Sequence, residues 1–268
     1  MVQEEKDYIH KDYKPCYRDY LKSDKDVFIK LFGQIRIETL KGVITSARLQ
    51  NAKYDLIKLF VVSNHPLNPK EIIEQIEPNK VPRGEGGIRQ LISSTRKITR
   101  NILPGGINLI ETMPNGYQLA SDLNIITDFS WFIKYCKKAN NESALIKKAR
   151  YLQKAVDLYR GDILVSDDSG DKIGVALTTT YNRICHNIVE ELCDINNQLA
   201  NYNDVHRVAA EALSRGFNDS DIHYWIIMSQ YALGRTDSAE KYKKNARKNL
   251  DEESFILLEK RINDELKK

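Results

Sequence analysis

The chain has 268 residues, of which 41% are hydrophobic and 29% are charged, and its formal net charge is +4. This length predicts two modest domains, and the balance of apolar and charged residues excludes extensive disorder. Because no apolar run approaches the roughly 18 residues needed to span a bilayer, we expect a soluble, cytoplasmic protein without membrane contact. Because the net charge is small, a surface that binds nucleic acid would have to come from a local cluster of Lys and Arg residues.

The first 26 residues are rich in Lys, Asp and Tyr with little periodicity, and we expect residues 1–26 to form a tail or linker. From Val27 to Ile37 apolar residues alternate with polar ones around a break at Gly33. A further short alternating segment runs from Val43 to Thr45. These segments predict short antiparallel strands.

Two helices are expected next. A helical apolar stripe ends at the breaker Asn64-His65-Pro66. Asn68-Pro69 followed by Glu71 is typical of a helix start, in which the Asn side chain caps the first turn. The inward-facing residues of these two helices are then Ala52, Leu56, Leu59, Phe60, Ile72, Ile73 and Ile76.

The segment 87–102 predicts a basic amphipathic helix. Its steps of three and four residues place one mostly apolar stripe on a single face, formed by Ile88, Ile92, Thr95, Ile98 and Ile102. The opposite stripe, flanked by Gln90 and Lys97, consists of Arg89, Ser93, Arg96 and Arg100. Residues 83–100 contain five cationic side chains and only one carboxylate. This chemistry suits base edges and phosphates in a major groove, although a solvated basic face gives the same pattern.

A short hairpin is expected directly behind this helix. Ile107 to Ile110 alternates, Pro114-Asn115-Gly116 is typical of a tight turn, and Tyr117 to Leu119 resumes an extended pattern. Strands, two helices, a basic helix and a hairpin together give the order of an α+β winged helix-turn-helix domain. We place this domain at residues 27–121.

These residues resemble the winged helix of response regulators. The run Ile110 to Tyr117 resembles its wing, and Ile92-Ser93 followed by Arg96-Lys97 resembles its recognition helix. Two departures stand out: Thr95 replaces a larger apolar residue, and no Lys or Arg lies between residues 101 and 121. The sequence therefore does not support the contact that a basic residue of such a wing makes with DNA, and Asn115 is left as a polar candidate. In the resembling family the loop that corresponds to 77–87 can contact RNA polymerase, and the alternative is that this loop is only a linker between helices.

Residues 122–268 have helical periodicity and an internal repeat of 34 residues. Leu192, Leu199, Val205 and Ala212 recur as Ile226, Leu233, Ala239 and Ala246. This is the tetratricopeptide period, and it predicts an all-α tetratricopeptide-like helical repeat domain.

The same region resembles the bacterial transcriptional activator domain of antibiotic-regulatory activators. The motifs are Asp128-Phe129-x-x-Phe132, the run Ala155 to Leu164, and Leu233-Gly234-Arg235. The two resemblances together cover about residues 27–266. They imply a transcription regulator, expected to be an activator, that binds double-stranded promoter DNA. They also imply that the helical domain supports homodimerisation or contacts with the transcription machinery.

The predicted DNA-binding residues divide by their place on the helix. Those of its first half, which we expect against base edges, are Arg89, Gln90, Ser93 and Ser94. Those expected near phosphates are Arg96, Lys97 and Arg100, and Asn115 is the candidate in the wing.

Nothing in the sequence indicates an enzyme. The four cysteines are widely spaced, the five histidines lie in unrelated contexts, and no nucleotide-binding glycine loop or metal-binding motif accompanies them. We expect no cofactor and no metal. The alternative function is a protein-interaction scaffold or ligand sensor whose winged helix no longer binds DNA. The groove of a helical array suits a peptide or a second copy of the chain equally well.

Overall fold

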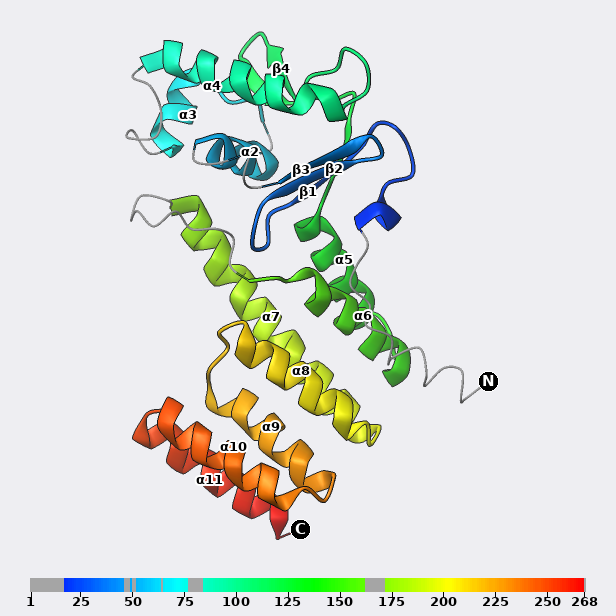
Figure 1. Ribbon diagram of the computed structural model, residues 1–268, viewed down its shortest axis with the longest axis vertical. Coiled ribbons are helices and arrows are strands. Elements are labelled where there is room, and N and C mark those ends of the chain that lie inside the picture. The colour runs from blue at the N-terminus through cyan, green and yellow to red at the C-terminus, as the bar shows by residue number, and fades with distance from the viewer. Residues whose placement is uncertain are drawn as a thin grey trace. The chain divides into compact units, whose positions relative to one another are not determined.

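The computed structural model describes residues 17–45, 49, 52–63, 65–76, 84–161 and 172–267. The chain divides into two compact units (Figure 1). One unit contains the described residues of 17–133 together with Asp157–Tyr181, and the other contains Lys134–Val156 and the described residues from Asn182 onward. We call the first the N-terminal unit and the second the helical unit. Each is described separately.

The N-terminal unit contains a four-stranded sheet of order β3-β2-β1-β6. Its strands are β1 (Asp26–Lys30), β2 (Arg36–Thr39), β3 (Gly42–Thr45) and β6 (Asn124–Thr127). The three predicted strands pair antiparallel, as expected, whereas β6 pairs parallel with β1. The predicted boundary between residues 121 and 122 therefore separates β6 from the sheet to which it belongs. A parallel partner almost 100 residues away leaves no local sequence pattern.

The segment before β1 is ordered from residue 17 onward. The 3-10 helix η1 (Tyr17–Tyr20) places Tyr17 and Tyr20 against Phe28, with ring centroids 4.9 and 5.3 Å apart. Leu21 is buried. This part of the expected tail is thus packed on the sheet, because its aromatic residues cover an apolar strand. Residues 1–16 of the expected tail lie outside the described part of the chain.

Three helices of the N-terminal unit share one apolar core. They are α2 (Ala52–Val62), α3 (Pro69–Gln75) and α4 (Gly84–Thr99), and the 3-10 helix η3 (Arg100–Ile102) follows. The predicted start of α3 is confirmed, because the Asn68 side chain accepts from the backbone of Glu71 while the Glu71 carboxylate accepts from Asn68 N–H. The shared core consists of Ala52, Leu56, Leu59, Phe60, Leu67, Ile72, Ile76, Ile88, Leu91, Ile92 and Ile110.

The predicted hairpin is confirmed as β4 (Ile110–Met113) and β5 (Gly116–Leu119), joined at Pro114-Asn115. Helices, sheet and hairpin together form a winged helix, followed in the chain by a helical domain. The fold class expected from the sequence is therefore confirmed.

A buried carboxylate attaches the start of α5 to the end of β1. Asp128 is fully buried, and its Oδ2 accepts the N–H groups of Leu31 and Phe32 at 2.9 and 2.8 Å. Its Oδ1 accepts the N–H of Phe129 at 3.1 Å. Burial raises the pKa of this carboxyl to about 7, against the opposing effect of these hydrogen bonds. Around it, Phe32 packs against the rings of Phe129, Phe132, Tyr159 and Tyr181.

The remaining described helices are α5 (Asp128–Asn140), α6 (Leu145–Leu158), α7 (Lys172–Gln198), α8 (Tyr202–Ser214), α9 (Ser220–Ala232), α10 (Thr236–Asn249) and α11 (Glu252–Leu266). In the helical unit, α9 packs against α8, α10 and α11 (Figure 1). No helix within the described ranges combines the length and apolarity that a membrane span requires. Of the motif Ala155 to Leu164, residues 162–164 lie outside the described part of the chain.

The predicted 34-residue repeat is visible in the backbone. Helix α7 ends in a turn where Asn201 N–H donates to Asn196 O, and α9 ends in the same turn, where Arg235 N–H donates to Gln230 O. The left-handed residue of the turn is Ala200 in the first repeat (φ 56°) and Gly234 in the second (φ 71°). Leu199 and Leu233 are half-buried, and the other matched apolar positions are buried in both repeats, namely Leu192, Val205, Ala212, Ile226, Ala239 and Ala246.

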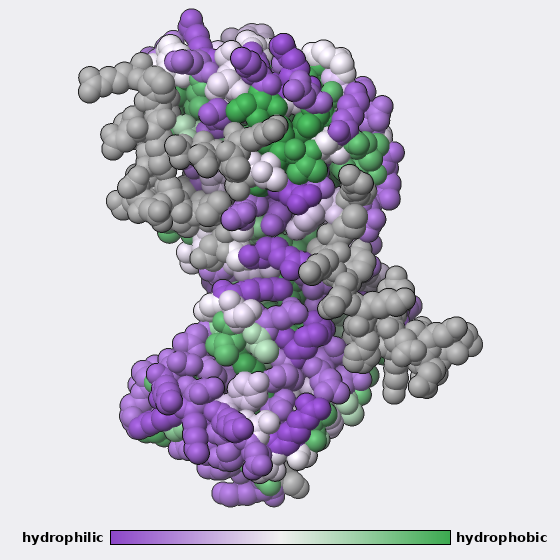
Figure 2. Space-filling view, in the orientation of Figure 1, coloured by the Kyte–Doolittle hydropathy of each residue, from purple (hydrophilic) through white to green (hydrophobic). Residues whose placement is uncertain are grey.

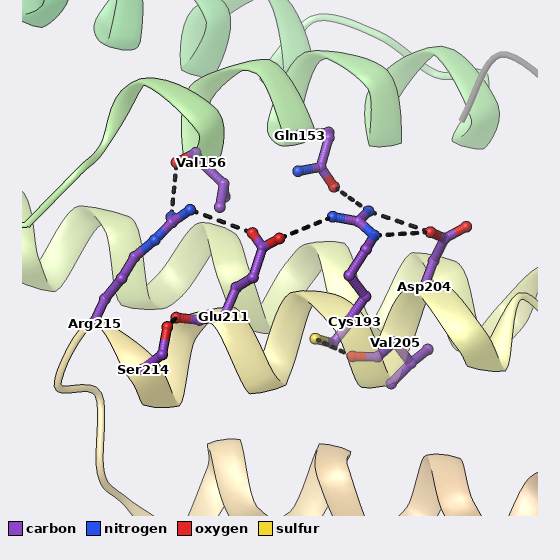
Figure 3. A network of polar contacts seen from close by, with 9 residues as sticks. Gln153, Val156, Cys193, Asp204, Val205, Glu211, Ser214 and Arg215 are labelled. Atoms are coloured by element: carbon purple, nitrogen blue, oxygen red, sulfur yellow. Dashed lines mark hydrogen bonds and ion pairs between the residues drawn. The ribbon is translucent and has the colours of Figure 1, made fainter. Parts of the chain in front are cut away.

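Polar contacts tie α8 to α6 inside the helical unit (Figure 3). The Arg207 guanidinium bonds to Gln153 at 3.0 Å and to the buried Asp204 at 3.2 Å. Eight residues after Arg207, at the C-terminal end of α8, Arg215 donates to the carbonyl of Val156 at 2.9 Å. Glu211 lies between the two arginines (Figure 3). On the face drawn in Figure 2, the surface over α8–α11 is mainly hydrophilic.

Candidate nucleic-acid interface

Helix α4 has a buried face and an exposed face. The buried face consists of Gly87, Ile88, Leu91, Ile92, Thr95 and Thr99. One predicted core position is corrected, because Ile98 is only half-buried while its neighbour Thr99 is fully buried. The stripe thus steps by four residues from Thr95 to Thr99, which follows the period of 3.6 residues better than a step of three does at this point. The exposed face is formed by the side chains of Arg89, Gln90, Ser93, Lys97 and Arg100.

The two buried threonines of α4 are satisfied by the helix itself. Thr95 Oγ1 donates to Leu91 O at 2.9 Å, and Thr99 Oγ1 donates to Thr95 O at 3.0 Å. A buried hydroxyl without a partner costs roughly 1–3 kcal/mol, and that cost is avoided here. The departure from the family pattern at Thr95 is therefore compatible with a well-packed helix.

The cations on the exposed face are available to a ligand. The side chains of Lys97 and Arg100 make no hydrogen bond or ion pair with any residue that the structure describes. Arg89 lies 3.6 Å from Glu85, but both side chains are well exposed. Exposed pairs of this kind contribute about 0–1 kcal/mol, so the contact with Glu85 costs little to break when Arg89 binds a phosphate. The exposed face of α4 therefore offers three cations, together with Gln90 and Ser93 as hydrogen-bonding groups.

Arg96 is turned toward the hairpin. Its Nε donates to Ile110 O at 2.8 Å, its Nη2 donates to Thr112 Oγ1 at 2.8 Å, and its guanidinium lies over the Tyr117 ring. We call this set of contacts the Arg96 clamp. Ser94 is also half-buried and donates to Leu91 O at 2.8 Å. The structure thus gathers the other predicted helix residues on one exposed face and gives Arg96 and Ser94 internal partners.

Glu111 is the one charged residue of the hairpin strands and their turn, residues 110–119. Glu111 accepts hydrogen bonds from the Gln118 side chain at 2.7 Å and from Ser121 N–H at 3.0 Å. These bonds, that of Gln118 above all, hold the pKa of Glu111 below its usual value, so its carboxylate is charged near neutral pH. Asn115 is exposed at the turn, as a contact residue has to be.

The other edge of the hairpin pairs with the segment before α3. Leu67 and Tyr117 exchange both backbone hydrogen bonds at 2.9 Å. Gly116 has φ +150°, and a Cβ there would lie 2.2 Å from Leu67 O. The sequence analysis missed this bridge and the Arg96 clamp. Gly116 was the only local sign of such a close approach, and it was interpreted as part of the turn alone.

Two kinds of chemical group bear on catalysis in the described part of the chain: clusters that could hold a metal, and thiols. No group of three or more His, Cys, Asp or Glu side chains able to hold a metal occurs among them. The described thiols are free, and burial raises the pKa of Cys136 to about 11 and that of Cys185 to about 12. Cys193 is also buried with a raised pKa. Such thiols are poor nucleophiles. Arg83 and the rest of residues 77–83 lie outside the described part of the chain.

The fold is similar to that of a solved structure. No family model and no curated protein matches the sequence. Among solved structures, the chain is similar to Mycobacterium tuberculosis EmbR in complex with a low affinity phosphopeptide, with a TM-score of 0.62 and 16% sequence identity. The match covers 89% of this chain and 65% of the EmbR chain, so this chain spans less than two thirds of EmbR. At this identity the likeness concerns the fold.

Proposed function

We propose that this protein is a transcription regulator that binds double-stranded promoter DNA through α4. The observation that carries the proposal is the exposed face of α4, where Arg89, Lys97 and Arg100 lie beside Gln90 and Ser93 on a helix positioned within a winged helix. In such folds the N-terminal half of the second helix of the helix-turn-helix meets base edges. A similarity in fold to EmbR supports this kind of protein.

The exposed side chains suit different parts of the duplex. Arg89 and Gln90 lie in the first half of α4, where a guanidinium bonds to guanine or an amide bonds to adenine. Lys97 and Arg100 lie near its C-terminal end and suit phosphates, as Asn115 does at the turn of the hairpin. Arg96 is excluded from this set in our proposal, because its guanidinium is already bound within the Arg96 clamp.

The partners of the helical unit are also a proposal. We assign it to homodimerisation or to contact with the transcription machinery, including RNA polymerase, and we assign the protein an activating role without enzymatic activity. We also propose a cytoplasmic location, because that is where a promoter of the bacterial type is accessible to a DNA-binding protein. Solenoid-like arrays of helices present extended surfaces suited to such contacts.

The test is duplex binding against a fragment pool from the source genome at two salt concentrations. We expect selective enrichment by the wild type that weakens at the higher salt, since phosphate contacts release counterions. Arg89→Ala should relax the sequence preference, because an arginine bonded to guanine discriminates by about 1–3 kcal/mol. Arg100→Ala should weaken all sequences alike.

Two outcomes would contradict the proposal. Absence of enrichment by the wild type at both salt concentrations would exclude DNA binding. Equal losses on selected and scrambled sites for Arg89→Ala and Arg100→Ala would refute the division of roles within α4.

One observation favours a second candidate function. The hairpin presents the charged Glu111 and has no Lys or Arg, and a carboxylate near the DNA backbone is repelled by phosphates. A protein-interaction scaffold with a winged helix that no longer binds DNA would account for it. Glu111→Gln separates the two functions, because it should strengthen duplex binding by a regulator and leave a scaffold without measurable affinity for DNA.

A further inference from the structure

The positive charge of the helical unit is concentrated in its α5 and α6 segments. Residues 134–156 contain seven Lys or Arg residues and one carboxylate, Glu142. Residues 182–268, the other part of this unit, contain 13 Lys or Arg residues and 15 carboxylates. The rest of the unit therefore has mixed charges of the kind that any soluble surface carries, whereas the excess of cations on α5 and α6 suits an anionic partner.

Four lysines of these two helices point outward. On α5, Lys137 and Lys138 are exposed. On α6, Lys147 and Lys154 are two turns apart and share one side of the helix with Tyr151, since they follow steps of four and three residues. Lys147 is exposed and Lys154 is half-buried. We call the four lysines the α5–α6 basic face.

Two cation–π contacts join the lysines of α5 to those of α6. Lys138 Nζ lies 5.5 Å from the centre of the Tyr151 ring, and Lys154 Nζ lies 5.7 Å from the centre of the Tyr135 ring. The first contact runs from α5 to α6 and the second from α6 to α5. Such contacts position an ammonium group over a ring without neutralising its charge. The two helices therefore present their lysines on one continuous surface.

The basic face has no carboxylate partner among the residues that the structure describes. None of its four lysine side chains has an ion pair or a hydrogen bond there. The other cations of the segment are engaged, since Lys148 lies 2.5 Å from Glu191, and Lys134 and Arg150 have contacts of their own. Glu142 accepts a backbone hydrogen bond in the turn between the two helices. The charge of the basic face is thus available to an external anion.

We infer that the α5–α6 basic face binds the phosphates of double-stranded DNA, as a second contact beside the one that α4 makes. The inference rests on the proposed function, because a duplex held by α4 is at high local concentration for another surface of the same chain. Lys147 and Lys154 are about 10 Å apart along α6, a distance over which one DNA strand presents about three phosphates. Lysine contacts with phosphates add affinity and salt dependence without sequence preference.

A membrane surface fits the basic face less well. Helices that lie on a lipid surface combine cations with aliphatic side chains that insert among the headgroups. The exposed Leu145 and Ile146, at the start of α6, are turned from Lys147 by about 100° or more around the helix axis. They lie beside the basic face and not within it. The side chains that lie among its lysines are the two tyrosines of the cation–π contacts.

The test is duplex binding by the full chain at several salt concentrations. The basic-face variant carries Lys137→Gln, Lys138→Gln, Lys147→Gln and Lys154→Gln together. The matched control makes the same change in net charge on α10 and α11, by replacing with Gln the exposed Lys241, Lys244, Lys248 and Lys260.

The basic-face variant should lower the log–log salt slope by about 2 or more, because each lost phosphate contact removes about 0.9. Its affinity should fall by about tenfold or more at about 0.1 M salt, on selected and scrambled sequences alike. The control should keep the slope within about 0.5 of the wild type. Arginine at the four positions of the basic face should also keep the slope, because the charge is retained.

A smaller variant guards against an effect on folding. Lys137→Gln combined with Lys147→Gln leaves both cation–π contacts in place and should still lower the slope by about 1 or more. Equal urea midpoints for this variant and the wild type show that the fold is kept.

The outcomes separate this inference from the proposed function. Selective duplex binding that both basic-face variants retain with the wild-type salt slope overturns the inference and leaves the role of α4 intact. Non-selective binding that is lost in the variants supports the basic face and overturns base recognition by α4. A wild type that binds no duplex overturns both. Binding to vesicles of anionic phospholipid that is lost in the variants, together with an unchanged duplex slope, assigns the basic face to a membrane and overturns the inference.

Discussion

The Arg96 clamp predicts that removing Arg96 harms stability more than it harms electrostatic attraction to DNA. Arg96→Ala removes a charged hydrogen bond to Ile110 O, a more exposed one to Thr112 and the contact with the Tyr117 ring. A charged hydrogen bond contributes roughly 1.5–3 kcal/mol when buried and less when exposed, and a cation–π contact contributes about 0.5–1 kcal/mol. Since Arg96 is half-buried, we expect the free energy of unfolding to fall by about 1–2 kcal/mol.

The matched variant is Arg100→Ala, which changes an exposed arginine whose side chain has no partner among the described residues. Its free energy of unfolding should stay within about 0.5 kcal/mol of the wild type. Its duplex affinity should depend less steeply on salt, with the log–log slope reduced by about 0.9 for one lost phosphate contact. Arg96→Ala should leave that slope unchanged, and Arg96→Lys should behave like Arg96→Ala because a lysine lacks the guanidinium fork.

Urea denaturation of the full chain and duplex binding at several salt concentrations measure both quantities. The clamp would be refuted if Arg96→Ala kept the wild-type free energy of unfolding and reduced the salt slope by about one. That result would show Arg96 to be a phosphate contact.

The other predictions concern stability. Ala200→Gly should raise the free energy of unfolding by about 0.5–1 kcal/mol, because a residue with a Cβ is strained in the left-handed conformation. Gly234→Ala at the equivalent turn should lower it by about 1 kcal/mol, and opposite signs in urea denaturation would contradict both expectations. Burial raises the pKa of Asp128 from its usual 3.8 to about 7, so between these values the folded state binds more protons than the unfolded state and loses stability as pH rises. The free energy of unfolding of the wild type should therefore fall by up to about 4 kcal/mol relative to that of Asp128→Asn from pH 4 to 7. A difference between the two proteins that is independent of pH refutes this expectation. Gly116→Ala should lower the free energy of unfolding by roughly 2 kcal/mol or more, because the added Cβ would clash with Leu67 O. The Tyr117 amide hydrogen should also exchange faster, and an unchanged exchange rate would contradict the backbone pairing of Leu67 with Tyr117.

Local patterns in the sequence predicted most of the elements. The capping of α3 by Asn68, the two faces of α4 and the hairpin at Pro114-Asn115 each depend on residues within one or two turns of one another. The 34-residue repeat was also visible, because it recurs at a fixed spacing. Such features are set by periodicity and turn chemistry, which the order of residues contains directly.

Contacts between distant segments were beyond these patterns. The N–H groups of Leu31 and Phe32 meet Asp128 across nearly 100 residues, and β6 joins β1 across a similar span. The partners of Arg96 lie 14 and 16 residues away, and they depend on where the hairpin folds back. The helical period gives the face on which Arg96 lies, but the direction of a long, flexible side chain depends on the surrounding tertiary structure.

The Arg96 clamp also divides α4 into positions that are free to vary and one that is not. Under the proposed DNA-binding role, a redesign for a different DNA sequence can exchange Arg89, Gln90, Ser93 and Lys97, since none of these side chains makes a hydrogen bond or ion pair with the hairpin within the described ranges. Transplanting a whole helix that lacks an arginine at this position would remove the Arg96 contacts and release the hairpin from α4. Grafts onto this scaffold should therefore retain that arginine, and failures of complete helix swaps would reflect a lost wing anchor rather than incompatible base contacts.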